Sequence, residues 1–254
     1  MNILETLLAK RANGHKSIAI LIDPDKAEDD ARLHSLLRLA AENCVDFVFV
    51  GGSLITSGNI SMLIGRIRKE TAIPIVLFPG GYLQIDPGAD GILFLSLISG
   101  RNPEFLIGQH VQAAPLLRQH KLEVLPTGYL LINSGRTTSV AYVSNTMPIP
   151  DDKYSLAATT ALAGQMLGLR LIYLDAGSGA EREIGSKMIA AVREAIDIPL
   201  IVGGGINTPD KATSALKAGA DLIVIGNTLE KDPDLLTEIA GRVYDWNQSL
   251  AHRQ

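Results

Sequence analysis

The chain has 254 residues, of which 46% are hydrophobic and 20% charged, values that are ordinary for a folded globular protein. We expect one domain over residues 1–254, because no Ser/Gly-rich linker or block of like charge divides the chain. The net charge of −4 supplies no basic field for a nucleic acid backbone, so no nucleic acid partner is expected. Cys44 is the only cysteine, which excludes an internal disulfide and a cysteine-rich zinc site.

No targeting or membrane-spanning segment is expected. The N-terminal residues MNILE lack the charged start and long apolar run of a secretory signal. Elsewhere no apolar run approaches the ~18–20 residues that span a bilayer. With one cysteine, these features predict a protein of the reducing cytoplasm.

Short apolar runs recur along the chain and are separated by stretches with helical spacing. Nearly continuous apolar character is typical of strands covered on both faces, as in a parallel sheet. Between the first two runs, Leu33, Leu36, Leu37 and Ala40 have the spacing of one buried helical face. The eight predicted strands are Ile18–Ile22, Phe47–Val50, Ile73–Phe78, Ile92–Leu95, Glu123–Ile132, Leu171–Leu174, Leu200–Val202 and Leu222–Ile225.

Eight strand–helix units in a chain of this length are typical of an α/β fold, the (β/α)8 TIM barrel. An open, doubly wound sheet would also alternate strands and helices. We favour the barrel because glycine-rich turns follow the seventh and eighth strands, where barrels often bind phosphate. In addition, no G-x-G-x-x-G motif follows the first strand. Asp46, Asp90 and Asp221 each precede a four-residue apolar run, which indicates repeated units of one architecture.

Two connections depart from this repeat. Residues 79–90 are few and rich in proline and glycine, so we expect an extended segment in place of the third helix and a thin barrel wall there. The long polar stretch Asn133–Pro150 is either a binding loop or a surface excursion. In the last unit, Thr208 and Pro209 predict the start of a helix and Gly219 its end.

The five histidines do not share the spacing of metal ligands. His34 and His110 lie in predicted helices, and we expect both on the surface. Trp246 is expected to pack on the last helix. No Cys/His pairing or G-x-S-x-G elbow supports nucleophilic hydrolysis.

Glycine-containing turns close the seventh and eighth predicted strands, as GGGI over 203–206 and as Gly226-Asn227. Glycines let backbone N–H groups approach an oxyanion closely, and the start of a following helix adds favourable partial charge. We therefore interpret the two turns as the cradle of one phosphate. The alternative is that they are tight turns that need a positive φ. The pattern is specific for phosphate but not for any one reaction.

The segment Tyr173–Ala180 (YLDAGSGA) follows at the carboxyl end of the sixth strand. Strand alternation predicts that Tyr173 and Asp175 point to the same side, toward the barrel mouth. Asp175 can accept hydrogen bonds from substrate hydroxyls or take a proton. Ser178 and the glycine amides can add phosphate contacts. The alternative is a strand-end aspartate that caps a nearby helix.

The sequence Asp23-Pro24-Asp25-Lys26 closes the first strand. Two carboxylates at a barrel mouth suit Mg²⁺, a hard cation that prefers oxygen ligands, and Ser53 after the second strand is a neighbouring oxygen. The alternative is an ordinary Asp-Pro-Asp turn. The ammonium of Lys26 either binds a phosphate or is solvated.

In these motifs the chain resembles the geranylgeranylglyceryl phosphate synthase family, within the wider group that includes heptaprenylglyceryl phosphate synthase. It is most similar to the second of the two sequence groups of that family. The SNTMPIP and YLDAGSGA strings are far more specific than the glycine turns. The matching segments, which run in order over nearly the whole chain, are 21–26, 51–53, 126–129, 144–150, 173–180, 203–206 and 226–227.

The resemblance implies an enzyme that joins sn-glycerol 1-phosphate to geranylgeranyl diphosphate and releases diphosphate, the first ether-bond step of ether-lipid synthesis. It implies Mg²⁺ at Asp23 and Ser53, catalytic roles for Asp175 and Tyr173, and a homo-oligomer. The implied glycerol phosphate site consists of Tyr173, Leu174, Asp175, Ala176, Gly177, Ser178, Gly179, Gly204, Gly205, Gly226 and Asn227.

Two positions depart from the pattern of the family. Asp175 stands where relatives often have Glu, so the carboxylate is kept on a shorter stem. Leu21 stands where some relatives have Lys, so a lysine contact to phosphate from that position is lost.

The resemblance leaves alternatives open. The same reaction with another prenyl length is one, a sugar-phosphate isomerase or aldolase barrel is a second, and a barrel that only binds a phosphorylated ligand is a third. For the prenyl chain we expect an apolar groove at the thin wall, formed by Tyr82, Leu83 and Ile85. The aromatic faces of Tyr173 or Tyr129 can ease positive charge at the allylic carbon.

Overall fold

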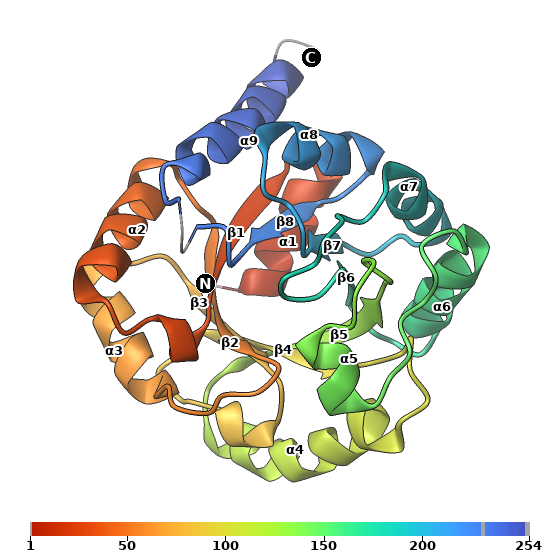
Figure 1. Cartoon of the computed structure of the whole chain (residues 1–254), viewed down its shortest axis with the longest axis horizontal. Coiled ribbons are helices and arrows are strands. Elements are labelled where there is room, and N and C mark those ends of the chain that lie inside the picture. Colours follow the sequence, from red (N-terminus) through yellow and green to blue (C-terminus); the bar gives the residue numbers. More distant parts are fainter. Residues whose placement is uncertain (1, 230–231, 252–254) are drawn as a thin grey trace.

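The computed structural model describes residues 2–229 and 232–251. Eight parallel strands close into a barrel in which each strand pairs with the next along the chain and the eighth pairs with the first (Figure 1). The predicted TIM barrel is therefore confirmed, and each strand lies within two residues of its predicted bounds. The strands are β1 (Ser17–Ile22), β2 (Phe47–Gly52), β3 (Ile75–Pro79), β4 (Gly91–Ser96), β5 (Glu123–Leu131), β6 (Leu171–Asp175), β7 (Leu200–Gly203) and β8 (Leu222–Ile225).

Helices surround the barrel (Figure 1). No helix in the ranges that the structure describes is long and apolar enough to cross a membrane. In the described part of the chain, short helical turns accompany the α-helices: η1 (Pro24–Lys26), η2 (Tyr82–Gln84) and the π-helical turn η3 (Glu104–Gly108). The α-helices are α1 (Ile3–Ala12), α2 (Asp30–Glu42), α3 (Ile60–Glu70), α4 (Gln109–Gln119), α5 (Ser139–Ser144), α6 (Tyr154–Met166), α7 (Ser186–Ala195), α8 (Pro209–Ala218) and α9 (Leu235–Ala251).

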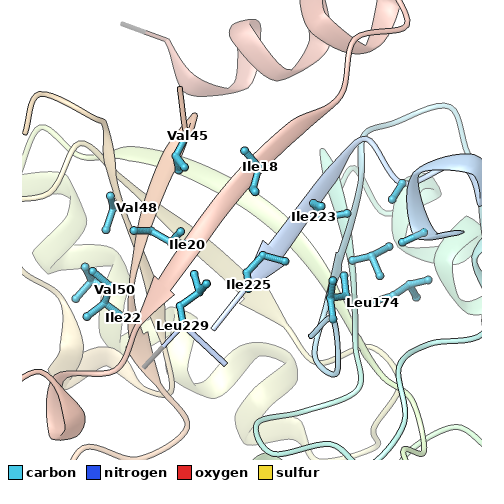
Figure 2. Packing of buried hydrophobic residues seen from close by; sticks show 14 of the residues in the cluster. Ile18, Ile20, Ile22, Val45, Val48, Val50, Leu174, Ile223, Ile225 and Leu229 are labelled. Carbon is cyan, nitrogen blue, oxygen red and sulfur yellow. The ribbon is translucent and has the colours of Figure 1, made fainter. Parts of the chain in front are cut away.

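Strand alternation divides the core into two layers. On β1, Ile18, Ile20 and Ile22 belong to the layer between the barrel and its helices, whereas Ala19 belongs to the barrel interior. Figure 2 shows the outer layer, in which these isoleucines lie near side chains of β2 and β8 such as Val48. Because every strand is covered on both faces, nearly continuous apolar runs were the correct signal for a parallel barrel.

Helix α1 closes the amino-terminal end of the barrel. Its Ile3 and Leu7 are buried in the interior cluster, together with Phe47 and Phe49 of β2. The carboxylate of Glu123, at the start of β5, accepts hydrogen bonds from the backbone N–H groups of Ile3 (2.6 Å) and Leu4 (2.9 Å). A carboxylate at this place satisfies two amides that have no partner within the helix, and it opposes the positive end of the helix dipole.

The three repeated aspartates join neighbouring strands at that same end. Each carboxylate accepts a hydrogen bond from a backbone N–H near the start of the preceding strand: Asp46 from Ile18 (3.0 Å), Asp90 from Ile75 (2.7 Å) and Asp221 from Leu200 (2.9 Å). Each also forms an ion pair with a basic side chain, in turn Lys10, Arg68 and Arg193. The repeated aspartate is thus a structural device of the barrel floor.

The irregular connection after β3 is confirmed. Between β3 and β4 all residues are described, and they contain the turn η2 and no α-helix. The expected ends of α8 are also present. The Thr208 hydroxyl accepts a hydrogen bond from the backbone N–H of Lys211 at 3.3 Å, Pro209 is the first helical residue, and Gly219 ends the helix at φ +116°.

Trp246 packs against the outer core layer from α9, as expected, and its indole N–H donates to the carbonyl of Gly14 at 3.2 Å. His34 is exposed, also as expected. The surface position predicted for His110 is wrong, because this side chain is 7% exposed. Its Nε2 lies 3.1 Å from the Ser96 hydroxyl, and its ring meets Phe94 edge to face at 4.4 Å.

We expect Asp221→Ala to destabilise the fold by about 3–5 kcal/mol, the range for removing one partner of a buried ion pair. The Asp221 side chain is 9% exposed and lies 2.8 Å from Arg193 Nη1 and 3.5 Å from Lys16 Nζ. Burial lowers the pKa of Lys16, and the charge of Asp221 opposes this shift. In the variant, Lys16 would be a buried ammonium that has lost this counter-charge. Urea unfolding of both proteins measures the difference. Asp152→Ala, which breaks the exposed pair with Lys153, is the control and should leave the unfolding midpoint unchanged.

Candidate functional site

A cavity of about 700 Å³ lies at the carboxyl ends of the barrel strands. Side chains and turns that follow all eight strands, or lie near their ends, contribute to its wall. The closed strand order brings these segments together although they are far apart in the sequence. In TIM-barrel enzymes the active site is built at this end, so the cavity is the candidate active site.

Tyr173 and Asp175 both point into this cavity from β6, as strand alternation predicted. Asp175 is 7% exposed. Its carboxylate accepts a hydrogen bond from the Tyr129 hydroxyl and another from the backbone N–H of Gly177 at 2.9 Å. Asp175 caps no helix, so the alternative interpretation of this residue does not apply.

Burial dominates the electrostatics of this carboxylate. It raises the pKa of Asp175, and the hydrogen bonds from Tyr129 and Gly177 only partly oppose that shift. Burial and the nearby Asp175 charge also raise the pKa of Tyr129 and of Tyr173 well above the usual value. Both phenols therefore stay neutral, and Asp175 is more basic than an exposed aspartate.

Aromatic rings form one wall beside Asp175. The rings of Phe78 and Tyr173 stack at 5.2 Å between centroids with an interplanar angle of 8°. Tyr129 lies 5.5 Å from Tyr173 and 6.1 Å from Phe78. This wall faces the cavity with apolar surface on which a hydrocarbon can pack.

The glycine turns after β6, β7 and β8 line the same cavity. At Gly204 the backbone has φ +79°, and a Cβ there would lie 2.8 Å from Asp175 Oδ1, so the turn itself demands glycine. Gly226 differs, because its nearest neighbour would lie 3.7 Å from an added Cβ and its φ is not positive. Neither the turn nor a close neighbour therefore requires glycine at position 226. The missing side chain leaves its backbone open to the cavity.

Asp23 and Asp25 have different environments, and the expected pair of cavity carboxylates is wrong in this respect. Asp23 lines the cavity. Asp25 instead accepts hydrogen bonds from the backbone N–H groups of residues 56–58 and from the Thr56 hydroxyl. These bonds hold the pKa of Asp25 well below its usual range. Asp25 anchors the loop after β2 and is not available to a ligand.

Ser53 lines the cavity close to Asp23, as the sequence predicted. The segments that carry Ser53 and Asp23 adjoin, since a Cβ added to Gly52, the residue before Ser53, would lie 3.6 Å from Asp23 Oδ1. The described residues contain no group of three or more His, Cys, Asp or Glu side chains that could hold a metal ion. A cation beside Asp23 and Ser53 would have one carboxylate and one hydroxyl as side-chain ligands.

Lys26 connects the β1 side of the mouth to the β8 side. Its Nζ lies 3.4 Å from Asp23 Oδ2 and donates to Asn227 Oδ1 at 2.9 Å. The Asn227 amide in turn donates to the Ser178 hydroxyl at 2.8 Å. Four polar side chains from the turns after β1, β6 and β8 thus form one chain across the mouth.

The stretch Asn133–Pro150 contributes to the site. It contains the six-residue helix α5, which the polar composition did not predict, and residues 137–140 and 142–144 line the cavity. Backbone hydrogen bonds from Asn133 N to Ile149 O (2.8 Å) and from Ile149 N to Leu131 O (2.9 Å) tie both ends to the barrel. Of the two interpretations left open, the structure favours the binding loop.

Two of the three residues predicted for the apolar groove line the cavity, whereas binding of the prenyl chain there stays a prediction. Tyr82 and Ile85 line the cavity. Leu83 is 84% exposed and is not part of the lining, so its expected role is wrong. The cavity lining also includes Phe94, Phe105 and His110, which sequence reasoning missed because nothing in their spacing shows that they face a cavity.

Comparison with known proteins agrees with this geometry. The model of the PcrB family matches residues 12–242. The chain belongs to the PcrB family. This family member is 56% identical to the geranylgeranylglyceryl phosphate synthase of Spirosoma linguale over 240 residues, 94% of this chain and 96% of that protein. It is 41% identical to the protein of the same name from Thermococcus kodakarensis, over 90% of each chain.

Solved structures show the same relationship. A crystal structure of (S)-3-O-geranylgeranylglyceryl phosphate synthase from Thermoplasma acidophilum, in complex with sn-glycerol-1-phosphate, superposes with a TM-score of 0.89. It is 35% identical in sequence, and the match covers 96% of this chain and 99% of that chain. An archaeal fructose 1,6-bisphosphate aldolase, with 16% identity and a TM-score of 0.61, shares the barrel fold alone.

We expect Tyr129→Phe to raise the pKa of Asp175 further, because the lost hydroxyl stabilises the ionised carboxylate. Carbon NMR of protein labelled at the aspartate carboxyl carbons follows this titration. Tyr173→Phe is the matched control, since Tyr173 is not among the groups that shift the pKa of Asp175. An equal pKa of Asp175 in wild type and Tyr129→Phe would contradict the assignment of this hydrogen bond.

Proposed function

We propose that this protein is a prenyltransferase that joins sn-glycerol 1-phosphate to geranylgeranyl diphosphate, giving geranylgeranylglyceryl phosphate and diphosphate. The observation that carries the proposal is the composition of one cavity, in which a buried carboxylate, backbone turns rich in glycine and an aromatic wall meet. A phosphate, a hydroxyl and a hydrocarbon each find a complementary surface there. The names of the relatives point to the same reaction.

The acceptor binds through its phosphate to the turns after β6, β7 and β8. Backbone N–H groups of Gly179, Gly204, Gly205 and Gly226, with the side chains of Ser178 and Asn227, form this part of the site. Gly177 lines the same turn, where its N–H donates to Asp175. Leu174 and Ala176 hold the backbone that carries these groups. The bound sn-glycerol-1-phosphate of the Thermoplasma acidophilum structure supports this choice of acceptor.

Asp175 orients the attacking hydroxyl of the glycerol and takes its proton. A new C–O bond forms to the allylic carbon while the bond from that carbon to diphosphate breaks, so the electron pair leaves with the diphosphate. The raised pKa of Asp175 suits proton transfer from an alcohol. The faces of Tyr173 and Tyr129 stabilise positive charge that develops on the allylic carbon.

Asp23 and Ser53 are the protein ligands proposed for Mg²⁺. The donor set fits, because Mg²⁺ is commonly held by one or two carboxylates together with water and substrate phosphate oxygens. When bound, the ion neutralises charge on the diphosphate leaving group. The prenyl chain runs along the aromatic wall and toward Tyr82 and Ile85.

The aldolase alternative lacks support in the barrel. A Schiff-base aldolase needs a lysine that points into the site from the barrel, and none of the eight strands described above contains a lysine. No specific observation favours an isomerase either.

We further propose a homo-oligomer in the cytoplasm.

The deciding experiment is mass spectrometry of the product from sn-glycerol 1-phosphate, Mg²⁺ and an equal mixture of prenyl diphosphates. Geranylgeranylglyceryl phosphate as the main product supports the proposal. A product with another chain length corrects the prenyl substrate only. Absence of any prenylated product rejects the prenyltransferase.

We expect Asp175→Asn to lower kcat about 10²- to 10⁴-fold, because the amide cannot accept the proton, while affinity for sn-glycerol 1-phosphate falls far less. Steady-state kinetics and calorimetric binding measure the two effects. Asp175→Glu keeps the carboxylate on a longer stem and should retain measurable turnover. If Asp175→Asn turns over like wild type, the protein only binds its ligands or uses another base.

We expect Asp23→Asn to raise the Mg²⁺ concentration for half-maximal activity at least about tenfold, since it removes the one proposed carboxylate ligand. Binding of sn-glycerol 1-phosphate without Mg²⁺ should not weaken, because the variant loses a negative charge near the phosphate site. Activity titrated with Mg²⁺ is the measurement. An unchanged Mg²⁺ requirement would remove Asp23 from the metal site.

A further inference from the structure

The charge of the cavity wall does not match the charge of the proposed substrates. The wall carries the acidic side chains of Asp23 and Asp175, and no Lys or Arg occurs among the described residues that line it. A phosphate and a diphosphate are both multiply negative, and charges removed from water need opposite charge nearby. Backbone amides supply only partial charges, so a cation close to the lining has particular importance for binding.

Lys26 is placed to supply this charge. Its ammonium lies 2.9 Å from Asn227 Oδ1 and 3.4 Å from Asp23 Oδ2, and both partners line the cavity. Asn227 belongs to the proposed phosphate site and Asp23 to the proposed metal site. The ammonium therefore stands at the border between the two.

The backbone that carries Lys26 is held in place. The turn η1 begins after Asp23, whose carboxylate accepts a hydrogen bond from the Asp25 backbone N–H at 3.1 Å, and the Lys26 N–H donates to the Asp23 carbonyl at 3.0 Å. Asp25 in turn fixes η1 to residues 56–58. The side chain is 40% exposed, so the ammonium can turn to a ligand while its backbone stays fixed.

We propose that Lys26 is a substrate-binding residue that donates a hydrogen bond to the phosphate of sn-glycerol 1-phosphate and whose charge lies between that phosphate and the diphosphate. The stem of a lysine is flexible, so the ammonium can turn toward a phosphate from the position that it holds beside Asn227 and Asp23. This inference rests on the proposed function.

A cation at this border lowers the repulsion between the two anionic groups. Binding of one therefore disfavours the other less than it would without Lys26, and this effect is a coupling free energy between the two sites. Leu21, at the end of β1, lies next to Gly226 but carries no charge. The positive charge at this end of the strand therefore comes from Lys26.

The test is calorimetric binding of sn-glycerol 1-phosphate to wild type, Lys26→Met and Lys26→Arg. We expect Lys26→Met to weaken binding about tenfold or more, the loss typical of a hydrogen bond to a charged group. Lys26→Arg keeps the charge and should recover part of the affinity. Repeating the titration with Mg²⁺ and inorganic diphosphate present measures the coupling, and the penalty that diphosphate imposes should be larger in Lys26→Met.

Two further measurements separate binding from a structural role. Because the lost contact is ionic, the affinity of Lys26→Met should depend less steeply on salt concentration than that of wild type. Lys153→Met, which removes an exposed lysine paired with Asp152, should bind like wild type. Binding of Lys26→Met within twofold of wild type, with an unchanged salt dependence, would overturn the inference. If wild type itself makes no prenylated product, the proposed function fails instead, whatever the binding data show.

Discussion

The enclosure of Asp175 is the constraint on which the rest of the site depends. The carboxylate is buried at the end of β6, where the barrel register sets Leu131 of β5 on one side of it and Gly203 of β7 on the other. On the β7 side, only residues without a side chain leave enough room. A Cβ on Gly203 would lie 2.3 Å from the Tyr173 hydroxyl oxygen, and one on Gly204 would lie 2.8 Å from Asp175 Oδ1. The triple glycine therefore makes space for the proposed acid–base group and also presents the amides proposed to bind phosphate.

The fold could be predicted from the sequence because its strands are covered on both faces. Apolar runs such as Ile18–Ile22 stand out from the helical spacing of α2, and alternation along β6 gave the correct direction for Tyr173 and Asp175. The function of the repeated Asp90 and Asp221 required the structure. Their hydrogen bonds go to the strand before them, and pairing of distant strands is not contained in local spacing.

The candidate site was predictable where a motif and a strand end coincide. The glycine turns, Asp175, Asp23 and Ser53 all line the cavity for that reason. The sequence did not distinguish Asp25, whose carboxylate is used by backbone amides of residues 56–58, from Asp23 beside it. Nor did it show that Leu83 points to solvent while His110 is buried, because a short helical turn and a π-helical turn change the direction of side chains without changing composition.

The closed floor of the barrel has a consequence for substrate entry and product release. Ile3 and Leu7 of α1 fill one end of the barrel together with Phe47 and Phe49, and among the described residues the cavity lies at the opposite end. The water-soluble acceptor and the prenyl donor of the proposed reaction would then share one entrance. The alkylated product leaves by that route too, so its departure has to precede the arrival of the next pair of reactants. In many enzymes with one entrance, product release rather than chemistry sets the rate of turnover.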